Sequence, residues 1–361
     1  MVGKLLIAGL LLLSTACRQL GPSEPSTSHT QTATDTSIEQ APVLVERAPD
    51  AGIGVRPAPP GNSIVNLFDA FGKPIEGTAK MFGFSALVRY EGKTILFDAG
   101  ASADVLKQNV EALGIDLSQV DFAVASHSHF DHISGFDYLL EVNPNVTIYF
   151  PNDIFWGAPF EYDASGTQPD AAQALPEEQR YFAGVPAKFN WESSGRFWKA
   201  NVRFVKAHQE IAEGVHLIAT RSPYMGYFTR YPDVGGHAQY KGKDVTKRID
   251  LPELSMSLAT SEGEVLLVGC SHSLVDVITR ETRTHLKRDI HLVLGGYHLL
   301  PYGVEEITEI VRRMKGEFGV ANVAPTHCTG HLGFKLFMEA YGDHYHFAGL
   351  GERLPFPSAH R

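Results

Sequence analysis

A short apolar segment that runs directly into a cluster of histidines constrains this chain more than any other feature. Residues 121–126 read Asp-Phe-Ala-Val-Ala-Ser, which predicts a buried strand, and His127, His129, Asp131 and His132 follow at once. His127 and His129 are two positions apart, so an extended backbone would direct both imidazoles to the same side. Three imidazoles and one carboxylate in so short a span form a ligand set suited to Zn²⁺, Mn²⁺ or Fe²⁺. Without a cation these groups would repel and desolvate one another, which disfavours the alternative of a solvated polar loop.

The rest of the folded region alternates between strands and helices, which is typical of a layered α/β structure. The expected strands, which include an opening hairpin, cover residues 85–90, 93–98, 258–260, 264–269 and 291–295. Apolar residues at helical spacing predict helices over residues 105–114, 133–141 and 304–319. Because the polar motifs follow apolar strands, we expect a site built at strand ends.

Composition and charge exclude several classes of protein. The chain has 361 residues, of which 43% are apolar and 20% are charged, a balance that supplies a large core and argues against disorder. It carries 31 basic and 41 acidic residues, for a net charge of −10, and no basic face stands out, so we expect no nucleic-acid partner. Three cysteines are too few for a scaffold held by disulfides.

The N-terminal residues predict export. A basic start at Lys4 is followed by an apolar run over residues 5–13 and then by Ser-Thr-Ala before Cys17. The run is shorter than the roughly 20 apolar residues that span a bilayer. The small residues before Cys17 resemble a bacterial lipoprotein signal, which implies cleavage before Cys17 and acylation of its thiol; ordinary signal cleavage is the alternative. Under the same resemblance, Arg18 implies anchoring to the outer membrane, with the protein on the periplasmic face.

Composition also sets the expected domain boundaries. Residues 1–17 form the predicted signal segment, and residues 18–61 are rich in Ser, Thr, Pro, Gln and Ala without apolar periodicity, so we expect a disordered tether. The folded domain is expected over residues 62–361. Within it, residues 151–250 are rich in aromatic side chains but poor in periodicity. This insertion either lines a ligand pocket or packs as a small subdomain against the sheet.

Residues 127–132, after their apolar strand, resemble the His-X-His-X-Asp-His motif of the metallo-β-lactamase superfamily. The resemblance implies a four-layer αββα sandwich with the site at one edge of its two sheets. It also implies that the first two histidines bind one metal ion and the Asp-His pair a second, with Zn²⁺ the expected ion. Residues 96–100 resemble an earlier motif of the family, whose aspartate, here Asp98, supports the site without ligating. A simple turn after a strand is the alternative for Asp98.

Three motifs in the C-terminal half resemble one branch of that superfamily, which includes 7,8-dihydropterin-6-methyl-4-(β-D-ribofuranosyl)aminobenzene 5'-phosphate synthase. They are Val-Gly-Cys-Ser-His-Ser over residues 268–273, Gly-Gly-Tyr-His-Leu over residues 295–299 and Pro-Thr-His-Cys-Thr-Gly over residues 325–330. His327 stands where the superfamily has its last histidine, which implies a ligand to the second metal. Cys270 stands where the superfamily usually has a bridging aspartate. We expect His272 to complete the shell of the first metal; a hydrogen-bonded structural histidine is the alternative.

Two roles near the predicted site stay open. His298 is either a metal ligand or a hydrogen-bond donor to a bound substrate. Cys270 and Cys328 either form a disulfide, which an exported protein permits, or remain free thiols beside the metal. A thiol next to a divalent cation would lose its proton and could bind it, and we favour the free thiols.

The predicted site favours an enzyme that hydrolyses a small molecule. A water activated by the metal would attack an ester, lactone, amide or phosphoester, while Asp131 orients the nucleophile and His298 steadies the developing oxyanion. The branch resemblance implies an alternative, a synthase (a transferase) whose metal holds a diphosphate leaving group, although no basic cluster for two phosphates is evident. A binding module that keeps a metal only for its fold is the third possibility, but a structural site is normally closed by four ligands.

Overall fold

The computed structural model describes most of the predicted domain. The described residues are 43–44, 61–153, 156–158, 160–162, 173–180, 187–189, 200–222, 239–240, 243–244 and 251–359. The chain divides into two compact units, residues 1–39 and 40–361, and every described residue belongs to the second unit. The predicted signal segment, Cys17 and most of the predicted tether lie outside the described residues. Within the described ranges, no helix has the length and apolar character that a membrane crossing requires.

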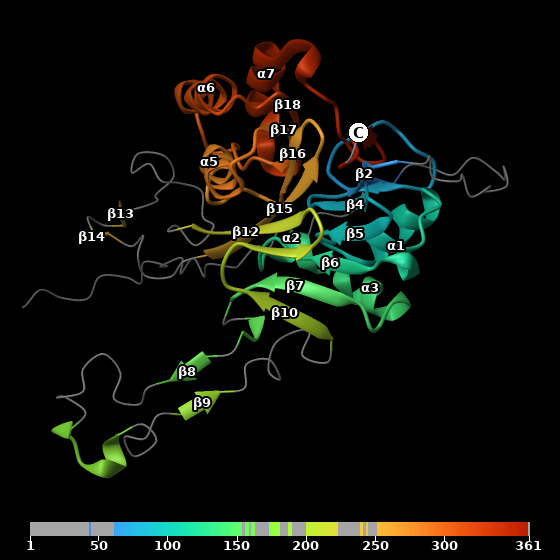
Figure 1. The fold of residues 1–361 in the computed structure, drawn as a ribbon. Coiled ribbons are helices and arrows are strands. Elements are labelled where there is room, and N and C mark those ends of the chain that lie inside the picture. Colours follow the sequence, from blue (N-terminus) through green and yellow to red (C-terminus); the bar gives the residue numbers. More distant parts are fainter. Residues whose placement is uncertain are drawn as a thin grey trace, which may run out of the picture. The chain divides into compact units, whose positions relative to one another are not determined.

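Two mixed sheets form the framework (Figure 1), with strand orders β10-β7-β6-β5-β4-β2-β19 and β11-β12-β15-β16-β17-β18. The strands of the first sheet are β2 (Ser63–Phe68), β4 (Ser85–Tyr90), β5 (Lys93–Phe97), β6 (Phe122–Val124), β7 (Thr147–Pro151), β10 (Asn201–Val205) and β19 (Arg353–Pro355). The strands of the second are β11 (Gln209–Ala212), β12 (Val215–Ser222), β15 (Leu251–Thr260), β16 (Gly263–Val268), β17 (Ile290–Gly296) and β18 (Asn322–Thr326).

Three short strand pairs lie outside these sheets. They are β1 (Val43–Leu44) with β3 (Ala79–Lys80), β8 (Phe160–Tyr162) with β9 (Ala187–Phe189), and β13 (Gln239–Tyr240) with β14 (Lys243–Asp244). Strand β1 falls inside the segment predicted as a tether.

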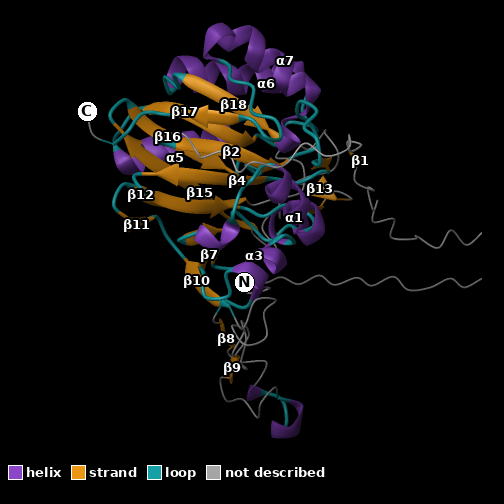
Figure 2. Cartoon of the chain, turned by 90° about the vertical axis from the view of Figure 1, so that its right-hand side faces the viewer, coloured by secondary structure: helices purple, strands orange, loops and turns teal. Residues whose placement is uncertain are grey.

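Helices cover the outer face of each sheet. They are α1 (Ala103–Ala112), α2 (Phe130–Ile133), α3 (Phe136–Val142), α5 (Val275–Leu286), α6 (Val304–Arg312) and α7 (Gly330–Tyr341). Side chains of α1 and α3 share one core cluster with the first sheet, and those of α5, α6 and α7 share another with the second. Figure 2 shows α6 and α7 beside β17 and β18. The layers therefore run helix, sheet, sheet, helix, and the predicted αββα sandwich of the α/β class is confirmed.

The alternation of side chains along a strand explains why each sheet is apolar on both faces. In β5, Ile95 and Phe97 point into the core between the sheets, whereas Leu96 points to the core under α1 and α3. All three side chains are fully buried. A strand covered on both faces reads as a continuous apolar run, which is how β5 is recognised in the sequence.

Two expectations about elements need correction. The helix predicted over 133–141 is interrupted: α2 ends at Ile133 and α3 begins at Phe136. Between them the backbone of Gly135 lies so close to the Ala99 carbonyl oxygen that a Cβ atom would be only 1.9 Å from it, so glycine is required there. Residues 201–222, placed inside the predicted insertion, instead form β10, β11 and β12 of the two main sheets. Strands β10 and β11 are edge strands with several exposed residues, so their apolar periodicity is weak.

Candidate metal centre

The carboxyl ends of five strands bring the candidate residues to one edge of the two sheets. Strands β5 and β6 run parallel, and so do β16, β17 and β18. The residues that follow them are Asp98 after β5, residues 127–132 after β6, Cys270 and His272 after β16, His298 after β17 and His327 after β18. Because parallel strands end at the same edge of a sheet, segments more than a hundred residues apart in the chain meet here.

Several of these strand ends adopt a backbone conformation that only glycine adopts freely. Asp98, Ser271, His298 and His327 have φ angles of 56°, 62°, 51° and 48°. Each such conformation costs about 1–3 kcal/mol for a residue with a side chain, and it persists where surrounding contacts hold it. The hydrogen bonds described below supply those contacts.

The first donor set consists of His127, His129 and His272, whose ligand atoms lie within 4.8 Å of one another. His272 Nε2 is 3.2 Å from His129 Nδ1. His127 Nδ1 is 2.9 Å from the Ser126 hydroxyl, while its Nε2 is buried with no hydrogen-bond partner among the described residues. Burial and the neighbouring imidazoles lower the pKa of His127, His129 and His272, that of His129 to about 4. These rings are therefore neutral at neutral pH and offer lone pairs.

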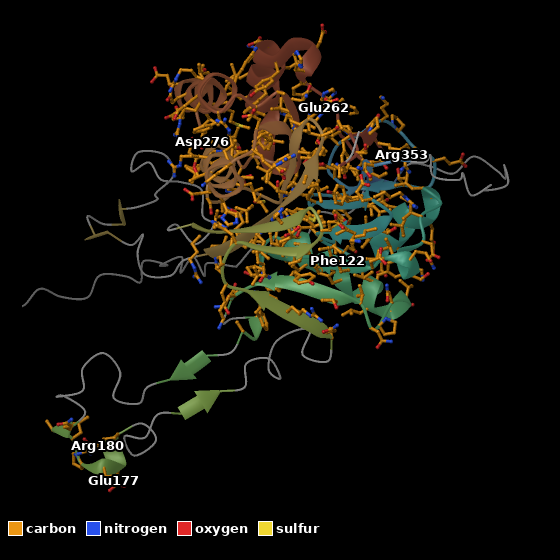
Figure 3. The ribbon with its side chains drawn as sticks, viewed as in Figure 1. Phe122, Glu177, Arg180, Glu262, Asp276 and Arg353 are labelled. Atoms are coloured by element: carbon orange, nitrogen blue, oxygen red, sulfur yellow. The ribbon has the colours of Figure 1, made fainter. Side chains whose placement is uncertain are left out.

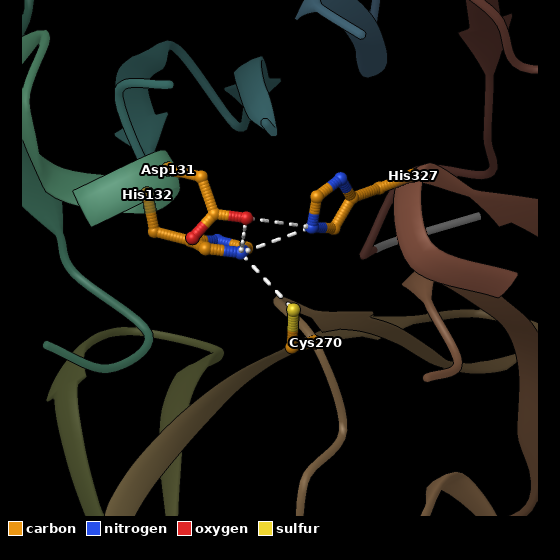
Figure 4. Close-up of side chains that lie close together, drawn as sticks. All are labelled: Asp131, His132, Cys270 and His327. Atoms are coloured by element: carbon orange, nitrogen blue, oxygen red, sulfur yellow. Dashed lines mark hydrogen bonds and ion pairs between the residues drawn. The ribbon is translucent and has the colours of Figure 1, made fainter. Parts of the chain in front are cut away.

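The second donor set consists of Asp131, His132, Cys270 and His327 (Figure 4). His132 Nε2 is 3.1 Å from Cys270 Sγ, 3.2 Å from His327 Nε2 and 3.7 Å from Asp131 Oδ2. His327 Nε2 is 3.3 Å from Asp131 Oδ2. A tetrahedral shell with bonds of about 2.0–2.3 Å has edges of about 3.3–3.8 Å, so these separations suit four ligands around one ion.

Charge supports the same interpretation of the second set. Burial acts to raise the pKa of Asp131, but the His132 and His327 imidazoles outweigh it and hold that pKa below its usual range. Asp131 is thus a carboxylate, directed at imidazole nitrogens. The donor atoms of both sets are the nitrogen, oxygen and sulfur ligands that divalent transition metals and zinc take, and the residues present fit such a cation.

Asp98 fixes the tautomer of His132 from behind the site. Its Oδ2 atom lies 2.7 Å from His132 Nδ1 and accepts the Ser126 hydroxyl at 2.7 Å, and its Oδ1 atom accepts the Ser126 N–H at 2.6 Å. The Nδ1 proton of His132 points at Asp98, so the lone pair of Nε2 points at the second donor set. Asp98 belongs to neither donor set and occupies the supporting place that the family resemblance implies.

Two further buried carboxylates hold ligand-bearing loops, and the sequence reading missed both. Asp69 accepts the backbone N–H of His327 at 3.1 Å and the Asn66 amide at 3.0 Å. Glu253 accepts the backbone N–H groups of His272 and Ser273, both at 3.1 Å. Asp69 directly follows the apolar strand β2, as Asp98 follows β5. An aspartate at the end of an apolar strand was therefore the feature of the sequence that could have indicated Asp69. Glu253 lies inside β15, where only a charged residue within an apolar strand marks it.

The structure brings His298 and the two cysteines to the same edge. Cys270 and Cys328 are buried free thiols with their sulfur atoms 3.3 Å apart, so the disulfide alternative does not hold. The His298 ring lies 4.1 Å from the His272 ring, centroid to centroid, and is outside both donor sets described above. Every predicted site residue among those the structure describes thus converges here, whereas Cys17 lies outside the described residues.

Comparisons with known proteins agree with this geometry. Residues 79–216 match the family model described as the metallo-beta-lactamase superfamily. The chain is 24% identical, over 283 residues, to a 7,8-dihydropterin-6-methyl-4-(beta-D-ribofuranosyl)-aminobenzene-5'-phosphate synthase from Methanocaldococcus jannaschii; the match covers 76% of this chain and 90% of that protein. An uncharacterized protein of the same organism is 27% identical over 250 residues, 69% of this chain and 84% of that protein.

A solved structure extends the agreement to the whole fold. Tm1679, a metal-dependent hydrolase of the beta-lactamase superfamily, superposes with a TM-score of 0.59 and 25% identity, covering 82% of this chain and 100% of that one. Fold and site therefore define a protein of the metallo-β-lactamase fold. The resemblance to that superfamily, and to the branch that includes the dihydropterin synthase, is confirmed.

Replacing Asp98 by asparagine should weaken metal binding about 10–100-fold, the usual cost of losing a partner behind a ligand. The introduced amide would donate to His132 Nδ1 and move the ring proton to Nε2, where it blocks the ligand atom. Competition with a chromophoric chelator measures the affinity. Asp121→Asn is the matched control, because Asp121 also caps a strand, by accepting the Thr94 N–H at 2.7 Å, but lies outside the site. Equal affinities in the two variants would contradict the role of Asp98.

Ionisation of Asp69 should cost stability in the metal-free protein. Burial raises the pKa of Asp69 from 3.8 to about 7, so the folded state holds this proton where the unfolded chain has lost it. Stability attributable to Asp69 is therefore present below about pH 4 and falls as pH rises to about 7, by roughly 1 kcal/mol per pH unit. Urea unfolding of the parent and of Asp69→Asn isolates the effect. The parent should lose stability relative to the variant across this window, and parallel pH profiles would refute it.

Proposed function

We propose that this chain is an exported, metal-dependent hydrolase that cleaves an ester, lactone, amide or phosphoester of a small molecule. The main support for this function is that two donor sets lie side by side at one sheet edge. The ring centroids of His127, in the first set, and His132, in the second, are only 4.3 Å apart. Two adjacent cation positions suit a displacement in which one oxygen attacks and another leaves. The fold is shared with a metal-dependent hydrolase, Tm1679, which supports the hydrolase class.

The residues of the two sets would hold one or two divalent cations, Zn²⁺ being the ion that imidazole and thiolate favour; Mn²⁺ and Fe²⁺ are the alternatives. Such a cation lowers the pKa of water and polarises the electrophilic oxygen of a substrate. Asp131 would keep its carboxylate charge and orient the nucleophile. The rings of His127 and His272 are buried, and His129 is the more open member of its set, so substrate would approach past His129.

Chelation should abolish turnover on a panel of esters, lactones, amides and phosphoesters, and Zn²⁺ should restore it, because the proposed nucleophile is a water molecule that only a bound cation activates. Asp131→Asn should lower kcat about 100-fold or more. His216→Ala is the control, since His216 lies in β12 with its backbone opposite Ser257, away from both donor sets. Turnover that survives chelation would refute the proposed chemistry.

A synthase reaction is the second candidate, favoured by the match to the dihydropterin synthase over 76% of this chain. In that reaction a cation held by the same donor sets would bind a diphosphate leaving group. Calorimetry with a pterin separates the two candidates. Binding of the pterin together with a lack of hydrolysis would favour the synthase, whereas no pterin binding would remove it.

We further propose that the mature chain is attached to a membrane, on the periplasmic side of the outer membrane, through a lipid on Cys17. The support is the basic, apolar and small-residue pattern of residues 1–17. Mass spectrometry of the protein from a bacterial membrane fraction should find an acylated Cys17 at the N-terminus. Cys17→Ser should release the protein from membranes without changing turnover. An unmodified mature chain that starts elsewhere would contradict the anchor.

A further inference from the structure

Beside the two donor sets lies a third cluster made by Cys270, His298 and Cys328. Its ligand atoms lie within 4.8 Å of one another, and all three residues are buried. The cluster shares Cys270 with the second donor set, and the His298 ring packs 4.1 Å from that of His272 in the first. Neither the family resemblance nor the reaction proposed above assigns a role to Cys328.

The separation of the two sulfur atoms suits a shared cation. They are unbonded and lie 3.3 Å apart, so a shift of about 0.5 Å would bring them to the roughly 3.8 Å that two thiolate ligands with bonds of about 2.3 Å span on one tetrahedral ion. Gly296 of β17 makes this approach possible, because a Cβ atom there would lie 2.8 Å from Cys328 Sγ. The thiols meet over the end of the strand that separates β16 from β18 in the sheet.

The three loops that carry these side chains are tied to one another, so the cluster is organised before any ligand arrives. The Ser271 hydroxyl donates to the Gly296 carbonyl at 2.7 Å. The Leu299 N–H donates to the Cys328 carbonyl at 3.2 Å, and the Tyr297 N–H donates to the Thr329 hydroxyl at 3.1 Å. His298 keeps a φ of 51° within this network. A strained ligand-type residue held by hydrogen bonds on both sides points to a functional position.

We propose that Cys270, His298 and Cys328 form a third cation position, which takes a thiophilic divalent ion of the Zn²⁺ class, with the Cys270 sulfur shared with the second donor set. Two thiolates offset the charge of one divalent ion, which the three neutral imidazoles of the first set do not. Thiolate and imidazole ligands select soft and borderline metals over Mg²⁺ or Ca²⁺. Two sulfurs and one nitrogen also leave a fourth position open. His298 is then a ligand, the first of its two open roles.

Cadmium binding tests this position without relying on turnover. The full chain is used in a Cys17→Ser background, so that Cys270 and Cys328 are the remaining thiols, and is reduced and freed of metal before saturation with Cd²⁺. Elemental analysis should find three equivalents in the parent and two in Cys328→Ser. The thiolate-to-cadmium absorbance of Cys328→Ser should be about a third that of the parent, because the shared Cys270 sulfur and the Cys328 sulfur make three cadmium–sulfur bonds in the parent and only one remains in the variant. His298→Ala should also lose one equivalent, and it gives a second test if Cys328→Ser fails to fold.

His127→Ala is the matched control, because it should lower the Cd²⁺ content yet leave the thiolate absorbance unchanged. Two equivalents in both the parent and Cys328→Ser, with equal absorbance, would overturn the third position and leave the hydrolase proposal intact. A parent that binds no Cd²⁺ would overturn both. Peptide mapping of the unreduced protein gives a further test. A disulfide between Cys270 and Cys328, together with a Cd²⁺ content that does not change when the disulfide is reduced, would also overturn the third position.

Discussion

The hydrogen bond between His132 Nδ1 and Asp98 decides what the rest of the site can do. It places the proton of the neutral His132 ring on Nδ1, away from the donor atoms, so that Nε2 can offer a lone pair to a cation beside Cys270, His327 and Asp131. The opposite tautomer would turn the same nitrogen into a donor and exclude a cation. Asp98 also binds both polar groups of Ser126, whose hydroxyl contacts His127, so one carboxylate organises members of both donor sets.

Two other buried carboxylates stabilise two further strand ends, through backbone rather than side-chain contacts. Asp69 holds the backbone of His327, and Glu253 holds that of His272. Burial raises the pKa of both acids, that of Asp69 to about 7, so each carries a desolvation cost that its backbone contacts only partly offset. Figure 3 draws the described side chains as sticks and labels Phe122 of β6, the strand that leads into residues 127–132. Burying these acids lowers the stability of the fold, and their contacts show what they contribute instead: each holds a donor residue in position.

The sequence could predict the parts of this site that are local. The histidine cluster follows an apolar strand, and the hairpin and β5 read directly from their apolar runs, because burial on both faces leaves a continuous signal. Asp69 and Glu253 could not be assigned, since the ligand-bearing backbone groups that they hold lie some 260 and 20 residues away, and only the folded sheet edge brings them together. Strands β10 and β11 were missed for a different reason: edge strands with exposed faces have no strong apolar period. The close approach of Cys328 to Cys270 likewise depends on Gly296, where a Cβ atom would lie 2.8 Å from Cys328 Sγ, and such a tertiary contact cannot be read from the sequence.

The two donor sets differ in charge, and this difference determines on which side of the site a substrate oxygen would bind. The first set consists of three imidazoles that their surroundings keep neutral, whereas the second contains the Asp131 carboxylate and the Cys270 sulfur. A cation on the first set would keep its full charge, and a cation on the second would be largely compensated. An electron-rich substrate oxygen would therefore be drawn toward the first set, which is also the side that His129 leaves open. The second set, whose four residues are buried, would then retain its cation, so that one set binds the substrate oxygen and the other retains metal.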